Sequence, residues 1–494
     1  MSMQTGSLSE KSRSYSLEDW KRGARSLNQE FDYVIDDVEG QIPPELNGTL
    51  FRNGPGLLDV NGQQLHHPWD GDGMICAITF KQGQAHFRNR YVRTEGYLAE
   101  QKAKRILYRG VFGTQKPGGC LANIFDFRLK NIANTQVIYW GEKLLALWEA
   151  ALPHCLNPHT LETLNLETFD GLLGKSAAIG AHPKIIFDSA QTPCLVAFGL
   201  KAGLRSKIDT YELDRQGKVI QHLVHRIPGF AFIHDFAVTP NYCIFFQPPV
   251  FFNPLPYVFG LRGPAECIQL QQNRSTRIWL IPRHPGQALQ VVETDPCFVF
   301  HHANAFEQGD SVIVDSVCYQ DFVGLDRDRA YPDNTDFDQL PPGQLWRFHL
   351  NLNQKTAKRQ LISPRCVEFP QVSPARIGQP HQWIFLGSAH HAEGNAPLQA
   401  ILKVHPESGQ QDFWSAAPQG FVGEPLFVPR LKKDRNSTAL EEEGWVITLV
   451  YDAAHDRTDV VILDGTCLAQ GPVARLHLKH HIPYGLHGTF TSEF

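Results

Sequence analysis

Short runs of β-branched and aromatic residues recur along almost the whole chain, and turn-forming residues join them in pairs. One clear pair is residues 75–80 and 85–92, which flank a turn that contains Gly83. Apolar runs of this length, joined by a short turn of this kind, are typical of β-hairpins. Further pairs follow toward the C-terminus, over residues 135–148, 207–227, 236–246, 276–293, 303–319, 399–415 and 445–464.

Helical periodicity is scarce outside two stretches, residues 17–29 and 98–110. Hairpins repeated every few dozen residues, without a Pro- or Ser-rich linker between them, favour a β-propeller; two β-sandwiches in tandem are the alternative. Six, seven or eight blades fit the length. We therefore expect one all-β domain over residues 16–494, preceded by a disordered Ser-rich tail at residues 1–15.

Composition and charge limit the classes of partner and the cellular compartment that we expect. The 494 residues carry 46 Lys and Arg against 51 Asp and Glu, so the basic excess of a nucleic-acid-binding protein is missing. The ten cysteines are scattered without a CxxC pair, which argues against a zinc ribbon or a thioredoxin-type site. Residues 1–16 lack the apolar core of a secretory signal, and no run approaches the roughly 18 apolar residues of a membrane span. We expect reduced thiols, a cytoplasmic location and no obligate protein partner.

Four of the 22 histidines have apolar or turn-forming neighbours instead of charged ones. A propeller brings together side chains from the inner strand of each blade, so metal ligands on its axis are far apart in the sequence. Any one histidine of this kind is more often an ordinary core or turn residue than a ligand. The four are His182, His234, His301 and His487.

Three glutamates have equally apolar surroundings: Glu149 after LLALW, Glu368 in CVEFP and Glu424 in VGEPLFVP. Burial of a carboxylate is unfavourable unless something pairs with it. A metal-bound histidine is one such partner, because its second ring N–H commonly donates to a carboxylate. Each glutamate alone also fits a strand end that faces solvent, and spacing alone does not join these seven residues into one site.

A series of short motifs resembles the carotenoid cleavage oxygenases. The motifs stand in that family's order from about residue 20 to the C-terminus: FRNGPG (51–56), HPWDGDGM (67–74), RLKNIANT (128–135), LLALWEA (144–150), FAFIHDF (230–236), FVFHHANAF (298–306), GQLWRF (343–348), NAPLQAILKV (395–404) and GEPLFVPR (423–430). Within the family the similarity is strongest to the cyanobacterial apocarotenoid oxygenases, which form retinal. The resemblance implies a seven-bladed β-propeller with a cap of helices and loops over the face that carries the active site.

The same resemblance implies one non-haem Fe(II) per chain, with O₂ as co-substrate. Matched motif by motif, the ligands are the four histidines singled out above, and His301 is the ligand of the His301-His302 doublet. Three of them would each pair with one of the three glutamates, and His182 would remain without one. Four neutral imidazoles leave the metal its full charge and two open positions.

The implied reaction is oxidative cleavage of a polyene double bond of an apocarotenoid, at the 15,15′ position, which gives retinal and a second carbonyl product. Such a reaction needs no general base, and the protein contributes the positioning of an apolar substrate. One alternative is off-centre carotenoid cleavage or stilbene cleavage at the same iron site. Another is a propeller that binds a ligand without catalysis, although such a protein has no need of seven buried polar residues.

The position of six residues near these motifs suggests a substrate tunnel. The threonine among them, at residue 135, would lie close to the iron, where its methyl group would restrict one open position. The aromatic residues also fit an ordinary propeller core. The six are Thr135, Trp148, Phe232, Phe300, Phe369 and Leu398.

Residues 247–261 are apolar and contain four prolines, which prevent a regular helix or a central strand. A loop packed beneath the cap is one interpretation. The other is an exposed lip that dips into a bilayer, from which a carotenoid could enter the protein without crossing water. We expect peripheral membrane association through this segment.

Overall fold

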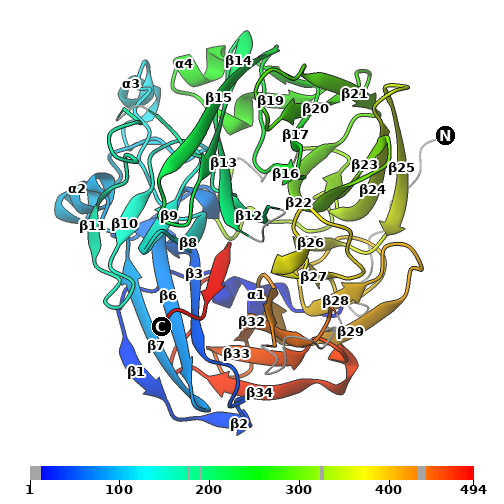
Figure 1. Cartoon of the computed structure of the whole chain (residues 1–494). Helices are drawn as coiled ribbons and strands as arrows, with labels where there is room; N and C mark the ends of the chain where they lie inside the picture. The colour runs from blue at the N-terminus through cyan, green and yellow to red at the C-terminus, as the bar shows by residue number, and fades with distance from the viewer. Residues whose placement is uncertain (1–12, 175–176, 189–191, 323–327, 431–440) are drawn as a thin grey trace.

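The computed structural model describes residues 13–174, 177–188, 192–322, 328–430 and 441–494. Antiparallel sheets stand around a central axis as in a propeller (Figure 1), so the expected all-β class is confirmed. The first sheets are β1 (Asp32–Ile35), β7 (Gln84–Tyr91), β6 (Asp72–Lys81), β3 (Gly48–Leu57) and β35 (Gly488–Thr491); β8 (Gln136–Trp140), β9 (Lys143–Leu147), β10 (His154–Leu156) and β11 (Thr163–Leu166); and β12 (Lys184–Phe187), β13 (Pro193–Lys201), β14 (Arg205–Leu213) and β15 (Val219–Pro228).

The next sheet has eight strands and consists of two consecutive meanders. A single parallel pairing, Glu293 with Thr356, joins them. The first meander is β16 (Ala237–Val238), β17 (Tyr242–Gln247), β20 (Thr276–Pro282) and β21 (Gln290–Thr294); the second is β22 (Phe298–Gln308), β23 (Ser311–Tyr319), β24 (Gln344–Asn351) and β25 (Thr356–Ser363).

Two further sheets complete the ring, and two short ribbons lie outside it. The sheets are β26 (Val367–Gln371), β27 (Ile384–Ser388), β28 (Ala400–Val404) and β29 (Gln411–Ser415); and β30 (Gly420–Val422), β31 (Leu426–Pro429), β32 (Gly444–Asp452), β33 (Arg457–Asp464), β34 (Pro472–His477) and β2 (Val38–Gly40). The ribbons are β4 (Asp59–Val60) with β5 (Gln63–Gln64) and β18 (Val250–Phe252) with β19 (Ile268–Leu270).

Strands from the two ends of the chain close the ring. β35, near the C-terminus, pairs with β3 of the first sheet, and β2, near the N-terminus, pairs with β34 of the last one. The apolar core lies between neighbouring sheets, and every residue of β3 is buried there. Pairing of strands from both ends with the first and last sheets ties the two ends of the chain into the ring.

Turn chemistry explains why the hairpins were predictable. Each predicted hairpin is present as an antiparallel pair, for example β6 with β7 and β8 with β9. Gln82 and Gly83 both have positive φ, at 52° and 77°, as the two-residue turn of a tight hairpin requires.

The two predicted helices are present but have different bounds. α1 spans Leu17–Gly23, and α2 spans Glu95–Ala103 instead of beginning at residue 98. The Thr94 side chain accepts the backbone N–H of Tyr97 and so fixes the start of α2 earlier than the apolar spacing indicates. Two short helices, α3 (Gly119–Asn123) and α4 (Leu255–Val258), were not predicted.

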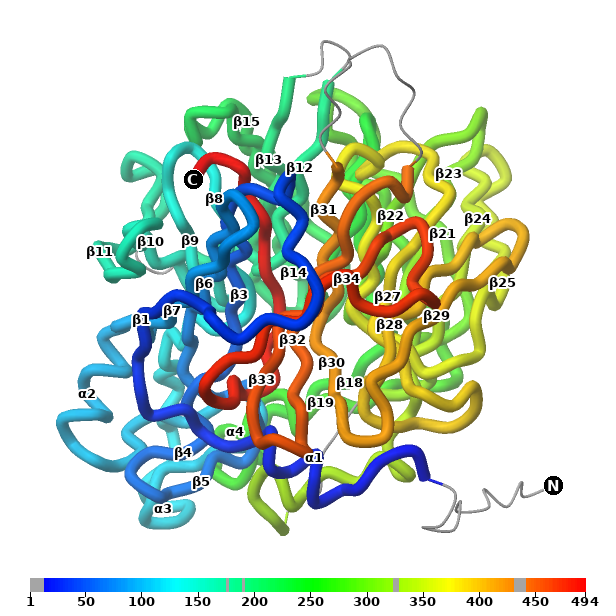
Figure 2. The backbone as a smooth tube through the Cα atoms, turned by 90° about the horizontal axis from the view of Figure 1, so that it is seen from below, coloured from blue at the N-terminus to red at the C-terminus, as the bar shows by residue number. Residues whose placement is uncertain are grey.

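The helices gather at one end of the ring. Figure 2 shows α1 to α4 together with the ribbon β4–β5 at the end opposite the C-terminus. Of the expected disordered tail, residues 1–12 lie outside the described residues, whereas the Tyr15 ring packs edge-on against Phe337. None of the described helices combines the length and the apolar character needed to cross a bilayer.

Candidate metal centre

The four histidines singled out in the sequence meet at one place. One ring nitrogen of each lies within 4.8 Å of the corresponding atoms of the other three. The Nε2 atoms of His182 and His234 are 2.8 Å apart. Residues separated by as many as 305 positions in the sequence thus converge on a common point, as the four-histidine set requires.

Each histidine lies at or near the start of a strand at the edge of a sheet. His182 precedes β12, His234 precedes β16 and His487 precedes β35, whereas His301 lies within β22. Their positions along the chain therefore follow the order of the sheets around the ring, which explains the wide spacing of the ligands in the sequence.

The strand around His301 departs from regular pairing. The register of β22 against β23 shifts between Val299 and His302, and again between His302 and Asn304. A β-bulge of this kind adds an unpaired residue and turns its side chain to a new direction. The irregularity allows the His301 ring to face the cluster from the edge of a continuous sheet.

In three of the histidines, the ring nitrogen that faces away from the cluster pairs with the carboxylate of a glutamate. His301 Nδ1 lies 2.5 Å from Glu368 and His487 Nδ1 lies 2.8 Å from Glu424. His234 Nδ1 pairs with Glu149 in the same way. Each of the three glutamates singled out in the sequence thus pairs with one histidine, and His182 is the one without such a partner among the described residues.

The electrostatics of the site favour a positive charge at its centre. Burial would lower the pKa of His301, but the Glu368 carboxylate outweighs it and raises that pKa. The pKa of His182 lies well below its ordinary value, because it is buried and because the other three histidines surround it. His182 is therefore neutral, and three carboxylates stand around the cluster.

A divalent metal with nitrogen ligands fits these residues. The Nε2 of His301 is buried and has no hydrogen-bond partner, although it points into the cluster. Three carboxylates and the Arg52 guanidinium that pairs with Glu424 leave two formal negative charges around four neutral rings. A doubly charged cation bound by imidazoles, which suit iron, zinc and copper, would neutralise both.

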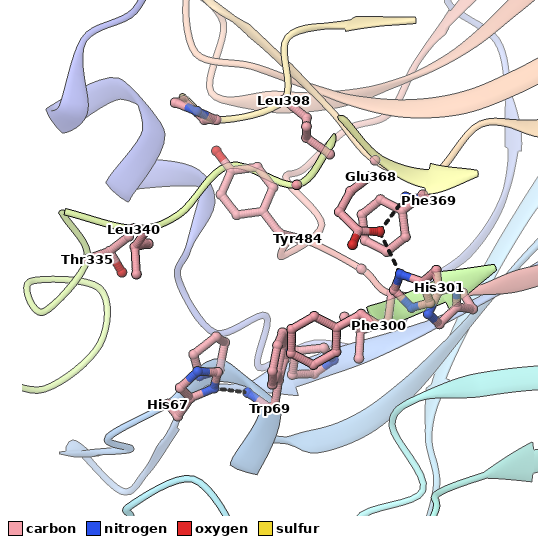
Figure 3. Close-up of a pocket in the computed structure, with 18 of the residues that line it drawn as sticks. His67, Trp69, Phe300, His301, Thr335, Leu340, Glu368, Phe369, Leu398 and Tyr484 are labelled. Carbon is pink, nitrogen blue, oxygen red and sulfur yellow. Dashed lines mark hydrogen bonds and ion pairs between the residues drawn. The ribbon is translucent and has the colours of Figure 1, made fainter. Parts of the chain in front are cut away.

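A cavity of about 340 Å³ reaches this cluster from the capped end of the ring. Figure 3 shows His301 and Glu368 on one side of it and Thr335 and Leu340 on the other. All six residues predicted to form a substrate tunnel line it: Thr135, Trp148, Phe232, Phe300, Phe369 and Leu398. The cavity is mainly apolar, and histidines and glutamates of the cluster are among its polar lining residues.

Phe300, Phe369 and Thr135 contact the histidines directly. Phe369 has a positive φ of 55°, a conformation that is costly for an aromatic residue, and its ring centroid lies 5.3 Å from that of His487. Strained backbone of this kind clusters at functional sites. The backbone carbonyl of Thr135 accepts the N–H of His487 at 3.1 Å, which places Thr135 beside that ring.

Sequence reasoning missed the outer half of the cavity. Its lining there comes largely from loops and helices of the cap, without any periodic pattern, and the motif HPWDGDGM supplies three of its members, His67, Pro68 and Trp69. The missed residues include Trp20, Trp69, Phe112, Tyr331, Phe337, Leu340 and Tyr484.

Known proteins resemble this chain over nearly its full length. The family model described as retinal pigment epithelial membrane protein matches residues 24–492. The apocarotenoid-15,15'-oxygenase of Synechocystis sp. (strain ATCC 27184 / PCC 6803 / Kazusa) is 50% identical over 97% of this chain and 97% of its own. The isoeugenol monooxygenase of Pseudomonas putida is 32% identical over 92% of this chain and 94% of its own.

A solved structure resembles the fold equally closely. The crystal structure of cobalt-substituted Synechocystis apocarotenoid oxygenase superposes with a TM-score of 0.93 at 49% identity, and the match covers 97% of this chain and 99% of that one.

Proposed function

Since the chain belongs to the family of retinal pigment epithelial membrane protein and the carotenoid cleavage oxygenases, we propose that it is an Fe(II)-dependent dioxygenase that cleaves apocarotenoids. The observation that carries the proposal is the four-histidine cluster, braced by three glutamates, at the inner end of an apolar cavity. We also propose that the two meanders of the eight-stranded sheet count as separate blades, so that the propeller has seven.

The ligands of one iron per chain would be His182, His234, His301 and His487. A ferrous ion held there supplies the electrons that make O₂ reactive toward an electron-rich double bond. The three glutamates each hold an Nδ1 proton, so that the Nε2 lone pairs of His234, His301 and His487 face the metal. No carboxylate then occupies a coordination position.

The cavity walls select and align the substrate. Apolar and aromatic side chains exclude water and favour a polyene, and Phe300 and Phe369, whose rings lie against His234 and His487, would hold one double bond beside the cluster. Thr135 and Trp148 line the same cavity and would limit the approach to the cluster. The products proposed from the similarity to the Synechocystis enzyme are retinal and a second carbonyl compound, with one atom of O₂ in each.

Product analysis tests this function. We expect aerobic incubation with apocarotenals of graded length to give retinal from the 15,15′ bond, with label from ¹⁸O₂ in both products. Cleavage only of a stilbene, or at an off-centre bond, would reassign the substrate, and no cleavage of any polyene would contradict the proposal.

A substitution at the cluster tests the metal. We expect His234→Ala to lose both iron and turnover, because one of four ligands is gone. The matched control is His154→Gln, which changes another buried histidine that lies outside the cluster. Iron analysis after anaerobic purification measures the first effect, and wild-type turnover by the alanine variant would disprove the ligand assignment.

We further propose that the protein binds membranes peripherally, as a cytoplasmic enzyme that takes its substrate from a bilayer. Within residues 247–261, four apolar side chains are exposed, and a second segment, residues 121–129, adds four more. They are Phe251, Leu255, Phe259, Leu261, Leu121, Phe125, Phe127 and Leu129. The ring centroids of Phe125 and Phe259 are 6.4 Å apart, so the two segments share one surface. A patch of this kind is unusual on a monomeric soluble protein.

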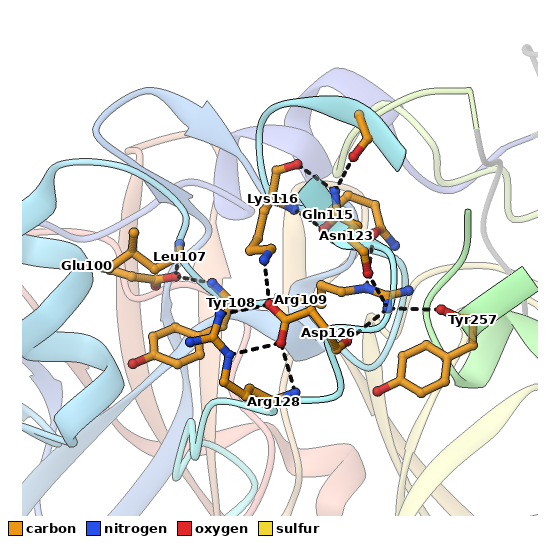
Figure 4. Close-up of polar contacts among 11 residues, drawn as sticks. Glu100, Leu107, Tyr108, Arg109, Gln115, Lys116, Asn123, Asp126, Arg128 and Tyr257 are labelled. Carbon is orange, nitrogen blue, oxygen red and sulfur yellow. Dashed lines mark hydrogen bonds and ion pairs between the residues drawn. The ribbon is translucent and has the colours of Figure 1, made fainter. Parts of the chain in front are cut away.

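Arg109 connects the two segments through hydrogen bonds to their backbones. Its buried guanidinium donates to the backbone carbonyls of Asn123 and Asp126 in one segment, of Tyr257 in the other and of Arg262 directly after it (Figure 4). The backbone that carries the exposed apolar side chains is therefore held in place, which lowers the entropic cost of inserting these side chains into lipid.

Vesicle binding tests the membrane proposal. Each inserted phenylalanine would gain up to about 1.5–3 kcal/mol, so changing Phe251 and Phe259 to serine should release the protein from neutral vesicles. The control is Val34→Ser, an exposed apolar residue on strand β1. Equal co-sedimentation of all variants would contradict this role of the segment.

A further inference from the structure

Asp235 follows His234 directly, and its carboxylate lies between three chain segments that each carry a histidine of the cluster. The side chain is only 1% exposed. Its Oδ1 lies 2.9 Å from the ammonium group of Lys184, two residues after His182. Its Oδ2 accepts the backbone N–H of His302 at 2.9 Å, one residue after His301. One carboxylate thus connects the segments of three ligands.

The bulge in β22 explains why the N–H of His302 is available. Pairing with β23 is interrupted on both sides of His302, at the point where the strand turns His301 toward the cluster. A buried backbone N–H without a partner is unfavourable, so an irregular strand of this kind needs an acceptor from elsewhere. Asp235 supplies it from the neighbouring segment and stabilises the bulged form.

The ion pair with Lys184 connects Asp235 to the segment of His182, which has no glutamate partner among the described residues. Among the residues that the structure describes, the ring of His182 has no carboxylate partner, whereas the ion pair between Lys184 and Asp235 anchors its segment to that of His234. Neither Lys184 nor Asp235 is among the residues that line the substrate cavity. The pair therefore acts behind the cluster, without touching substrate.

We propose that Asp235 is a positioning residue of the metal centre, which holds His182, His234 and His301 at ligand spacing before the metal binds. This inference rests on the metal centre proposed above. Without the carboxylate, the bulge at His302 and the segment of His182 lose their common anchor, and the ligand atoms spread. Outer partners of metal ligands commonly change metal affinity by roughly 10–100-fold.

The test is Co²⁺ binding by the full-length metal-free protein, measured by competition with a chromophoric chelator. Asp235→Asn keeps the size of the side chain but cannot receive both the Lys184 ammonium and the His302 N–H, and Lys184→Met removes the same ion pair from its other side. Lys184→Arg restores a cation. The control is Asp459→Asn, another fully buried aspartate, which pairs with His477 and Arg475 away from the cluster.

We expect Asp235→Asn and Lys184→Met each to weaken Co²⁺ binding roughly tenfold or more. The double variant should be less impaired than the two single effects combined, because both remove one interaction. Lys184→Arg should bind Co²⁺ nearly as the wild type does. Asp459→Asn should lower the denaturation midpoint of the metal-free protein and leave Co²⁺ affinity unchanged.

Two results would overturn the assignment while leaving the metal centre intact. One is wild-type Co²⁺ affinity in Asp235→Asn and Lys184→Met. The other is an equal loss of affinity in Asp459→Asn, which would reduce Asp235 to a general contribution to stability. If Asp235→Asn does not fold, Lys184→Met decides alone, since Lys184 is 20% exposed. Failure of the wild type to bind one Co²⁺ per chain would overturn both this inference and the proposed function.

Discussion

On two sides of the histidine cluster a glutamate pairs with a histidine, but the two glutamates have different surroundings. On one side Glu424 is 2% exposed and holds His487, the Arg52 guanidinium, the Gln371 amide and the backbone N–H of Gly488. On the other side Glu149 is 32% exposed, lines the cavity and, among the described residues, has His234 as its polar partner.

The difference separates two roles that a glutamate can play next to a metal ligand. Glu424 is part of a buried ionic network of protein groups, since Arg52 and His487 together keep its pKa below the ordinary value despite burial. Glu149 lacks such a counter-charge, so its negative charge is available to a cation at the centre. Glu368 is intermediate, because the Tyr319 hydroxyl donates to it at 2.6 Å but no guanidinium does. Substitution should therefore lower stability most at Glu424, less at Glu368 and least at Glu149.

The largest effect is expected for Glu424→Gln. The change leaves the Arg52 guanidinium buried opposite a neutral amide, and breaking a buried ion pair in this way costs about 3–5 kcal/mol. Chemical denaturation of the metal-free protein measures the loss. Adding Arg52→Met to the same chain should recover part of it. An unchanged midpoint in Glu424→Gln would show that the two sides of the cluster do not differ as the contacts indicate.

Glu368→Gln should have a smaller effect on folding and a clear one on metal. The amide still accepts from Tyr319, and losing one charge-assisted hydrogen bond costs about 1.5–3 kcal/mol. Metal affinity should fall roughly 10–100-fold, because His301 loses the carboxylate that orients it. Tyr319→Phe serves as the control that removes a hydrogen bond to Glu368 but leaves its charge. Equal metal affinity in all three proteins would argue against the role of the carboxylate.

Glu149→Gln should change stability least, by about 0.5 kcal/mol or less, since the side chain is partly exposed and has no buried counter-charge. Its effect should instead appear as a roughly tenfold loss of metal affinity or turnover. Denaturation and iron content measured on one preparation separate the two quantities. A stability loss as large as that of Glu424→Gln would erase the distinction between the sides.

Local chemistry made much of the fold predictable. The hairpins could be recognised because a turn such as Gln82-Gly83 must adopt positive φ, and few sequences do so readily. Helix bounds were less accessible, because α2 begins where Thr94 caps it and not where apolar spacing starts. The unpredicted helices α3 and α4 are too short to show periodicity, and contacts with Arg109 hold both.

The candidate site was predictable as a set of residues but not as a network. Motif resemblance pointed to the four histidines, and an apolar setting singled out the three glutamates. No sequence pattern says that Arg52 pairs with Glu424 or that Asp235 contacts Lys184, because these contacts join segments from different blades. The cap residues Tyr331 and Phe337 line the cavity for the same reason: tertiary packing places them there, without a local signal.

Because β35 closes the ring, the histidine cluster can form only late in the synthesis of the chain. His487 lies directly before that strand and pairs through its backbone with Thr135, more than 300 residues earlier in the chain. On the ribosome, His182, His234 and His301 emerge long before it, so a nascent chain offers three ligands and an open ring. The four-histidine cluster cannot form until β35 has docked, so a metal held by all four rings would bind only after this strand has been synthesised.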